Sequence, residues 1–383
     1  MKNKRILLIA STDLQKDSVG KLFIESFVNI ATEIDFTAYV QRQFILSGKK
    51  FGSSAIGKLS LAVLLRIGFI QTFRIFIYKI FYLTNDIELI LRKSNEIDAE
   101  SIWITLSTIE LILISNELIK MKKCVKVTVW DAPEYLSYSI RLSSKCTEHV
   151  MQVFGEVIKN SNQVSVISDA MKREYLNFYG VTSSVIRHVI PQYPINVDKK
   201  NCKKIRIVFA GSLYSKHEWN SFISALEEVN WKINQKSVYL YFIGSFPRFG
   251  VIKSKRIIFT GVKNFEQTMQ LMLRMNIGYL PYWLDQKFSI VARTSFPGKL
   301  SAYAASGLAV FHHGPEYAEA SAFLNQYQFG LTCASLDRNA VINELSKLDV
   351  HSTSTKCVDA RKNALQTELS VATMSQRFIE FIS

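Results

Sequence analysis

The feature that most constrains the fold of this 383-residue chain is an alternation of short apolar runs with longer amphipathic stretches. Apolar runs bounded by polar residues predict buried strands, and the amphipathic stretches between them predict helices. Strands that alternate with helices predict parallel sheets with right-handed crossovers. The predicted strands cover residues 4–10, 35–40, 102–106, 125–130, 164–167 and 184–189, and then 205–210, 238–243, 257–260, 277–280 and 308–311.

Several of the predicted helices carry local signals at their ends. Ser168 or Asp169 can cap a helix over residues 170–179, and Gly180 can terminate it. The other predicted helices cover residues 20–31, 217–229, 265–275 and 299–306, and further helices are expected between 360 and 382. Each lies between two predicted strands or at the end of the chain, as a parallel α/β fold requires.

The alternation is interrupted once, which divides the chain into two domains. Residues 190–204 contain two prolines and several basic residues without periodicity, which predicts an interdomain linker. We place this linker at residues 193–203. We therefore expect an α/β protein with two Rossmann-like doubly wound domains, 1–192 and 204–365, facing across a cleft. A C-terminal helix within 366–383 is expected to cross back to the first domain.

The formal net charge of +15 implies a surface that attracts anions. The basic residues are scattered, which argues against a nucleic-acid partner. The five cysteines are widely spaced and form no CxxC or Cys/His cluster, so we interpret them as reduced thiols of a cytoplasmic protein. The apolar run that starts the chain stops at Ser11, and no signal peptide is expected.

The longest apolar stretch, residues 56–83, is interrupted by Lys58, Arg66, Arg74 and Lys79, so it does not predict a membrane-spanning helix. The spacing of the charges fits a basic amphipathic helix or helix pair that lies on a membrane. It equally fits a core helix pair with solvated charges, and both interpretations stay open.

Ligands of open parallel sheets bind at the carboxyl ends of the strands. In the second half, Gly211 and Ser212, Gly244, and Tyr282 follow predicted strands. A glycine at such a position lets backbone N–H groups approach a phosphate, although turn sterics alone also explain most of these glycines.

The segment 294–307 is more specific. Pro297 is predicted at the first position of a helix, with Ser295 before it and Gly298 and Lys299 after it. Free N–H groups at this helix start and the charge of Lys299 would suit a diphosphate, and an ordinary capped helix fits as well.

Three segments, FAGSLY (209–214), residues 259–282 and SFPGKLSAYAASGLAV (295–310), resemble the nucleotide-binding half of GT-B glycosyltransferases. They are most similar to the retaining, family-four-like enzymes of capsule, O-antigen and exopolysaccharide synthesis. The resemblance covers most of 205–335 and implies that the helix with Lys299 and Tyr303 lies beside the donor, and that Gly211 faces its diphosphate.

Two positions depart from that family pattern. Many relatives carry a glutamate where this chain has Ala302, and an arginine where it has Ser212. Only Lys216 then supplies positive charge near Ser212, and His217 is the alternative source of that charge. The chain has no Asp-x-Asp pair, the motif that holds a divalent ion in other transferases. We therefore expect no metal and no other cofactor, with backbone dipoles and Lys299 stabilising the leaving diphosphate.

In the first half, Asp131 follows the predicted strand 125–130. It is the candidate catalytic residue, as a ligand of acceptor hydroxyls or as a base in an inverting reaction, and helix capping is the alternative. His312 and His313 are expected after a strand, where they could contact the donor sugar, and no metal role is expected for them.

These observations predict a glycosyltransferase that moves a sugar from a nucleotide-sugar donor to a glycan acceptor, expected to be polyprenyl-linked, at the inner face of the membrane. Residues 56–83 would make the membrane contact. Two alternatives are a catalytically weakened partner subunit, suggested by Ala302 and Ser212, and a nucleotide-sugar epimerase of the same architecture.

Overall fold

The computed structural model describes residues 4–10, 34–40, 68–191, 203–246 and 254–383. The chain forms two compact units, the first made of Met1–Ile186 with Arg377–Ser383 and the second of Arg187–Gln376. The predicted linker 193–203 and the predicted helix 20–31 lie almost wholly outside the described residues.

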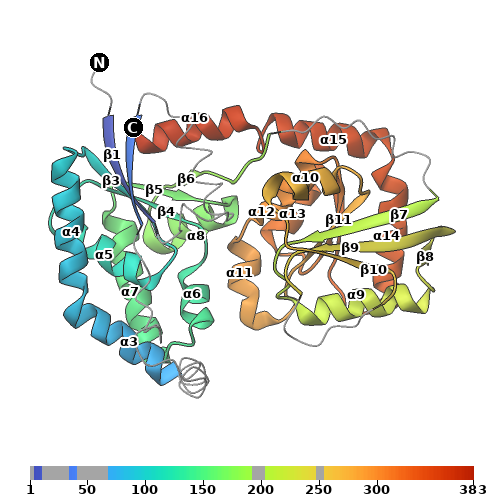
Figure 1. Ribbon diagram of the computed structural model, residues 1–383, viewed down its shortest axis with the longest axis horizontal. Helices are drawn as coiled ribbons and strands as arrows, with labels where there is room; N and C mark the ends of the chain where they lie inside the picture. Colours follow the sequence, from blue (N-terminus) through green and yellow to red (C-terminus); the bar gives the residue numbers. More distant parts are fainter. Residues whose placement is uncertain (1–3, 11–33, 41–67, 192–202, 247–253) are drawn as a thin grey trace. The chain divides into compact units, whose positions relative to one another are not determined.

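The first unit is built on a parallel sheet with the strand order β2-β1-β3-β4-β5-β6 (Figure 1). Its strands are β1 (Lys4–Ala10), β2 (Ile34–Val40), β3 (Ser101–Thr105), β4 (Val125–Val129), β5 (Gln163–Val166) and β6 (Ser184–Val185). The apolar runs predicted these strands within a residue or so, except that β6 is four residues shorter than the predicted 184–189. β3 and β4 are buried along their whole length, as expected for central parallel strands.

The helices of the first unit are α3 (Gly68–Phe81), α4 (Leu83–Glu96), α5 (Ile109–Lys120), α6 (Pro133–Ser139), α7 (Ser144–Asn160) and α8 (Asp169–Tyr179). α8 has the predicted ends, because the Ser168 hydroxyl accepts from the N–H of Met171 and Gly180 is left-handed at φ 69°. Both signals are local in sequence, which is why they could be identified without the fold.

The last seven residues belong to the first unit, although the helix that carries them, α16 (Val371–Ile382), begins in the second. Phe378 packs on Trp103 of β3 with a centroid separation of 5.1 Å. Lys126 of β4 donates to the carbonyl of Ile382 at 2.6 Å, and Lys4 of β1 donates to that of Ser383 at 2.6 Å. These lysines satisfy carbonyls that the end of a helix leaves without an intrahelical partner.

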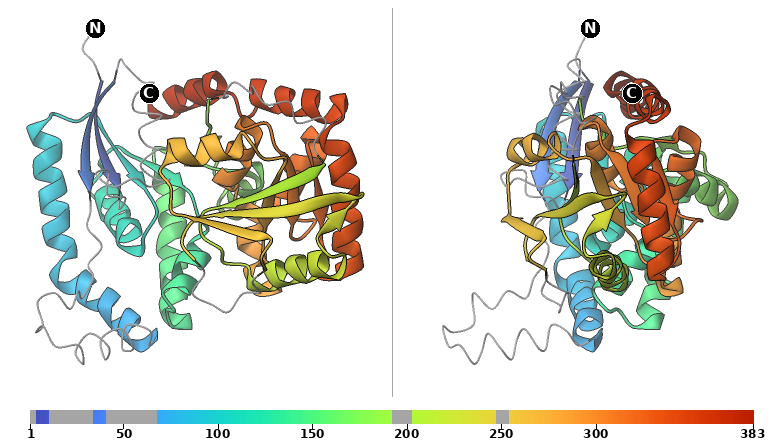
Figure 2. Two further views of the ribbon diagram at one scale, coloured as in Figure 1. Left: turned by 45° about the vertical axis from the view of Figure 1, so that its right-hand side comes forward. Right: turned by 90° about the vertical axis from the view of Figure 1, so that its right-hand side faces the viewer.

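The second unit has the strand order β10-β9-β7-β11-β12-β13, parallel along this path, with the short β8 antiparallel to β9. The strands are β7 (Lys204–Ala210), β8 (Lys232–Ile233), β9 (Lys236–Ile243), β10 (Ile257–Gly261), β11 (Ile277–Pro281), β12 (Ala309–His313) and β13 (Gly330–Cys333). Counted from β7 without β8, this is the doubly wound order 3-2-1-4-5-6 of a Rossmann domain. Figure 2 shows β7, β9 and β10 side by side at the near edge of this sheet.

The helices of the second unit are α9 (Lys216–Glu228), α10 (Phe265–Met272), α11 (Ser289–Thr294), α12 (Gly298–Ala305), α13 (Glu319–Tyr327), α14 (Arg338–Ser352) and α15 (Thr355–Gln366), with a short 3₁₀ helix at Gln286–Phe288. They cover both faces of the sheet, as two neighbouring residues of β11 show. Tyr279 stacks on Phe222 of α9 at 4.1 Å, whereas Gly278 lies against the ring of Tyr303 on α12. Successive residues of a strand point to opposite faces, so α9 and α12 lie on opposite sides.

Candidate functional site

The most informative position in the second unit is the point where the strand order reverses, between β7 and β11. From β7 the chain winds toward β9 and β10, and from β11 it winds toward β12 and β13. In doubly wound sheets the loops after two such strands leave in opposite directions, and ligands bind between them. Gly211 and Tyr282 are the first residues after β7 and β11.

Gly211 and Gly244 bring the backbones of two neighbouring loops into contact. Gly211 has φ 102°, and its N–H donates to the carbonyl of Ile243 at 2.8 Å. A Cβ atom on Gly244, which has φ 149°, would lie 2.4 Å from the carbonyl oxygen of Gly211. Glycine is needed at both positions because of this contact, as the steric explanation of these glycines expects. The N–H groups of Gly211 and Gly244 are both occupied, the second by the carbonyl of Gly261 at 3.0 Å.

Lys299 lies directly over the first of these loops. A Cβ atom on Gly211 would be 3.2 Å from Cε of Lys299, and the ammonium Nζ lies 5.3 Å from the ring centre of Phe209 and 5.1 Å from that of Tyr214. Within the described residues, Nζ makes no hydrogen bond or ion pair. Burial against these rings lowers the pKa of Lys299 to about 8, because a cation there is poorly hydrated. Such a cation without a carboxylate partner favours an anionic ligand.

The amide groups at the start of α12 lie beside this lysine. The helix covers Gly298–Ala305, one residue earlier than the predicted range 299–306, and Pro297 has the extended backbone of an N-cap residue with ψ 124°. Pro297 therefore does not occupy the first helical position, which corrects the sequence prediction. It makes no side-chain cap, so the first N–H groups of α12 lack the partner that a capping side chain would give them. These groups, at Gly298 and Lys299, suit an anion.

Two aromatic residues that the sequence analysis did not identify, Tyr214 and Trp283, border the same site. The ring of Tyr214 lies 4.4 Å from that of Trp283 and 5.9 Å from that of Tyr282. Trp283 stacks on Phe288 at 4.3 Å. The only sequence signal was that Tyr214 and Trp283 each follow a predicted strand closely, which many aromatic residues do. Flat rings of this kind can pack on a base or on the apolar face of a sugar.

Two further polar groups near these loops are buried without a complete set of partners. Glu218, in the first turn of α9, accepts from the N–H of Leu284 through Oε1 at 2.8 Å, whereas its buried Oε2 has no partner in the described part of the chain. Burial raises the pKa of this carboxyl group. The hydroxyl of Ser295 is likewise buried without a partner among the described residues. Buried polar atoms are normally satisfied, so both groups are candidates for ligand contact.

The histidine pair differs from its sequence prediction. β12 continues two residues beyond the predicted 308–311, so His312 and His313 are its last residues and are fully buried. His313 has both ring nitrogens occupied, at 3.1 Å from the Tyr279 hydroxyl and 2.8 Å from the Ser335 carbonyl oxygen. The predicted contact of His313 with a donor sugar is therefore wrong, because apolar strand packing extends to the end of β12.

His312 keeps one nitrogen without a partner. Its Nδ1 lies 3.3 Å from the Thr332 hydroxyl, whereas its buried Nε2 makes no hydrogen bond within the described chain. Burial lowers the pKa of His312 to about 3 and that of His313 to about 4. Both rings are therefore neutral at physiological pH.

The remaining predicted donor residues take different positions. Tyr303 is fully buried, and its hydroxyl accepts from the N–H of Ala210 at 3.3 Å and donates to the carbonyl of Tyr279 at 3.0 Å. It therefore ties α12 to β7 and β11 from beneath the site. Ser212 and Lys216 are exposed, and Ala302 is buried.

In the first unit, Asp131 follows β4 and precedes α6. The N-cap of α6 is Ala132, and no side chain caps this helix, so the capping alternative for Asp131 is not realised. The carboxyl group is partly buried and makes no ion pair or hydrogen bond with the described residues. Burial raises its pKa, which would suit a group that accepts a proton.

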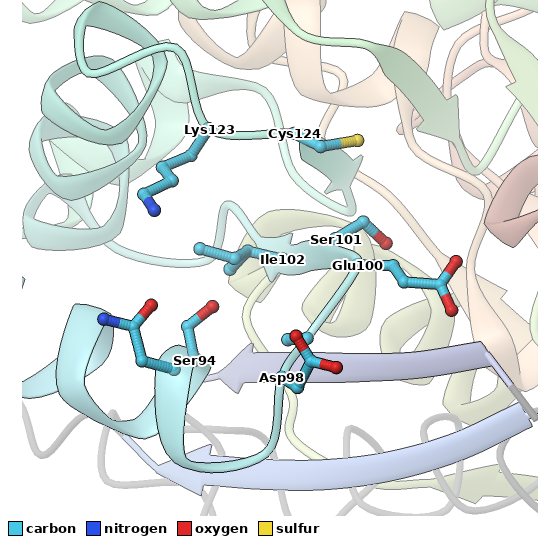
Figure 3. A pocket seen from close by; sticks show the side chains of 9 residues that line it. Ser94, Asp98, Glu100, Ser101, Ile102, Lys123 and Cys124 are labelled. Atoms are coloured by element: carbon cyan, nitrogen blue, oxygen red, sulfur yellow. The ribbon is translucent and has the colours of Figure 1, made fainter.

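A small hollow of about 100 Å³ lies at the opposite, amino-terminal end of this sheet (Figure 3). Its lining includes Asp98, Glu100, Lys123 and Cys124, and Asp98 is ion-paired with Arg5. The charges are mixed, and the hollow is far along the strands from Asp131, so we do not assign it to the site. Across the described ranges, no group of three or more His, Cys, Asp or Glu side chains could hold a metal ion.

The two parallel sheets, the doubly wound order and the glycine loops at the switch point are the features of a GT-B fold, and comparison with known structures confirms this class. No protein-family model matches the sequence, and no curated protein matches it. Sucrose-phosphate synthase from Thermosynechococcus elongatus matches with a TM-score of 0.66 at 12% identity, over 99% of this chain and 98% of that chain.

Two more solved structures match over almost their whole length. Trehalose-6-phosphate synthase OtsA has a TM-score of 0.60 at 10% identity, covering 99% of this chain and 98% of its own. Alr3699/HepE from Anabaena, solved in complex with UDP-glucose, has a TM-score of 0.60 at 13% identity, covering 98% and 99%. At such low identity the likeness establishes the fold, and the expected pair of Rossmann-like domains is thereby confirmed.

Proposed function

We propose that this chain is a glycosyltransferase that binds a nucleoside diphosphate sugar in its second unit. The observation that carries the proposal is the half-buried ammonium of Lys299, which lies over Gly211 and pairs with no carboxylate among the described residues. Lys299 belongs to the first turn of α12, which has no side-chain cap. A diphosphate matches this arrangement in charge and in its number of acceptor oxygens. The structural similarity to HepE, which was solved with UDP-glucose, supports the same ligand class.

In the proposed reaction the bond between the anomeric carbon and the diphosphate breaks, and a bond to an acceptor oxygen forms. Lys299 and the amides of Gly298 and Lys299 would take up the charge that develops on the leaving diphosphate. Ser212, Gly244, Tyr282 and Ser295 complete the proposed donor contacts. Because the chain has no Asp-x-Asp pair, we propose that this stabilisation needs no metal ion.

Asp131 is the proposed catalytic residue on the acceptor side. Its pKa is raised, and its carboxyl group does not cap α6. Both features fit a carboxylate that holds an acceptor hydroxyl and, in an inverting reaction, accepts the proton of that hydroxyl. We propose a lipid-linked glycan acceptor of surface polysaccharide synthesis, at the inner face of the membrane. A sugar phosphate is a second candidate, since the sucrose-phosphate and trehalose-6-phosphate synthases share the fold.

Nucleotide binding followed by transfer tests this proposal. Thermal-shift titrations with UDP, GDP, CMP and their sugars would identify the base, and Lys299→Met should require a much higher nucleotide concentration for the same shift. Transfer from the donor so identified, with EDTA present, would then be measured on polyprenyl-diphosphate glycans and on glucose 6-phosphate. Binding without transfer would favour a non-catalytic partner subunit, which Ala302 and Ser212 suggested. Interconversion of the bound sugar would favour an epimerase, and no binding would refute the donor site.

A further inference from the structure

The helix α3 has an unusual distribution of apolar side chains. Ile75 and Tyr78 are buried, and the Tyr78 hydroxyl donates to Asp86 of α4 at 2.6 Å, which fixes the inner face of the helix. The outer side carries more apolar side chains, where a solvated helix would have polar residues. Phe73 is 50% exposed, Phe76 59%, Ile80 50% and Phe81 64%.

These four exposed residues form one stripe, which we call the α3 outer face. Positions 73, 76 and 80 are spaced by three and four residues, so they lie above one another on a helix, and position 81 adjoins them. Three phenylalanines in one stripe are more than the scattered apolar residues of an ordinary surface. Lys79 lies beside the stripe, with its Nζ 3.5 Å from Nε2 of His149.

The charge of the surrounding sequence indicates what this face binds. The 50 residues from 36 to 85 contain no aspartate or glutamate. The same stretch contains seven basic residues, namely Arg42, Lys49, Lys50, Lys58, Arg66, Arg74 and Lys79. An anionic lipid surface attracts basic residues and takes up aromatic side chains beside them. No helix in the described part of the chain is long and apolar enough to cross a membrane.

We propose that the α3 outer face docks this protein on the surface of an anionic membrane, with Phe73, Phe76, Ile80 and Phe81 inserted at the level of the headgroups. The structure thereby narrows the broad segment 56–83 to one described helix and one face of it. The proposal does not depend on sugar transfer, and its test needs no substrate.

The test is flotation of the full chain with vesicles of phosphatidylglycerol and phosphatidylcholine, compared with vesicles of phosphatidylcholine alone. We expect binding to the anionic vesicles, weaker binding to the neutral ones, and weakening of the anionic binding as salt is raised from 0.1 to 0.5 M. The variant Phe73→Ser/Phe76→Ser/Phe81→Ser should lose at least tenfold in vesicle affinity. A matched control is Phe178→Ser, which removes a 71% exposed phenyl group from α8 and should bind like the wild type.

The single variant Phe76→Glu provides a milder second test, and urea unfolding verifies that both variants fold. The proposal is overturned if wild type does not float with anionic vesicles, or if the triple variant floats as well as the control. It is also overturned if sedimentation shows a wild-type dimer that the triple variant dissociates while vesicle binding is unchanged, since the face would then join two copies of the chain.

Discussion

Replacement of Lys299 by methionine separates ligand binding from folding. Methionine retains most of the apolar side chain that packs on Gly211 and the Phe209 and Tyr214 rings, and removes the charge. A hydrogen bond to a charged group contributes ~1.5–3 kcal/mol, so nucleoside diphosphate binding should weaken roughly ten- to hundredfold. Isothermal titration calorimetry with the nucleotide identified by thermal shift would measure this loss.

Lys299→Met should stabilise the protein in the absence of nucleotide, although it weakens nucleotide binding. The pKa of Lys299 is lowered to about 8 from 10.5 by burial, so the native state carries a cation that is poorly solvated below pH 8. Removing it should raise the free energy of unfolding at pH 7 by ~1–2 kcal/mol, a figure reduced for partial exposure. The unfolded chain binds the proton more tightly, so wild-type stability rises between pH 8 and 10.5 and the advantage of Lys299→Met disappears there.

The pH dependence of binding gives a third readout. The diphosphate needs the ammonium form, so the dissociation constant for wild type should rise about tenfold from pH 7 to pH 9 as Lys299 loses its proton. Lys299→Arg keeps its charge and should show no such rise. Equal nucleotide affinity of wild type and Lys299→Met would refute this reasoning. So would a joint loss of affinity and stability, because Lys299 would then be a packing residue.

Three other predictions follow from buried groups. Gly278→Ala should lower the free energy of unfolding in urea by ~1–3 kcal/mol or more, because its Cβ would lie 2.4 Å from the Tyr303 ring, and an unchanged midpoint would contradict this packing. Asp131→Asn should abolish transfer without weakening nucleotide binding, and full turnover by this variant would exclude Asp131 as the base. Turnover by the wild type should fall as pH drops through the raised pKa of Asp131. The free energy of unfolding should decrease as pH falls from 6.5 to 4, by up to ~3 kcal/mol each for His312 and His313, because the unfolded chain takes up protons that the buried rings do not. If His312→Asn shows the same pH dependence of the free energy of unfolding as wild type, His312 does not contribute to it.

The sequence by itself determined most of the strands and the ends of some helices. Short apolar runs predicted most strands, because a buried parallel strand has to be apolar on both faces. The Ser168 cap and the left-handed Gly180 were predictable because both depend on residues only a few positions apart. Glycine after β7 and β9 indicated where backbone could approach a ligand, although it could not show that Gly211 and Gly244 contact each other.

Only the tertiary structure decided which of these residues act together. Strand order depends on pairing between distant segments, so the position of Lys299 over Gly211 and between two rings could not be read from residues 294–307 alone. The burial of His313 in β12 depends on Tyr279 and Ser335, which come from other elements of the chain. The phenylalanines of α3 had looked like either core or surface residues, because periodicity shows that a helix has two faces and only packing shows which one is covered.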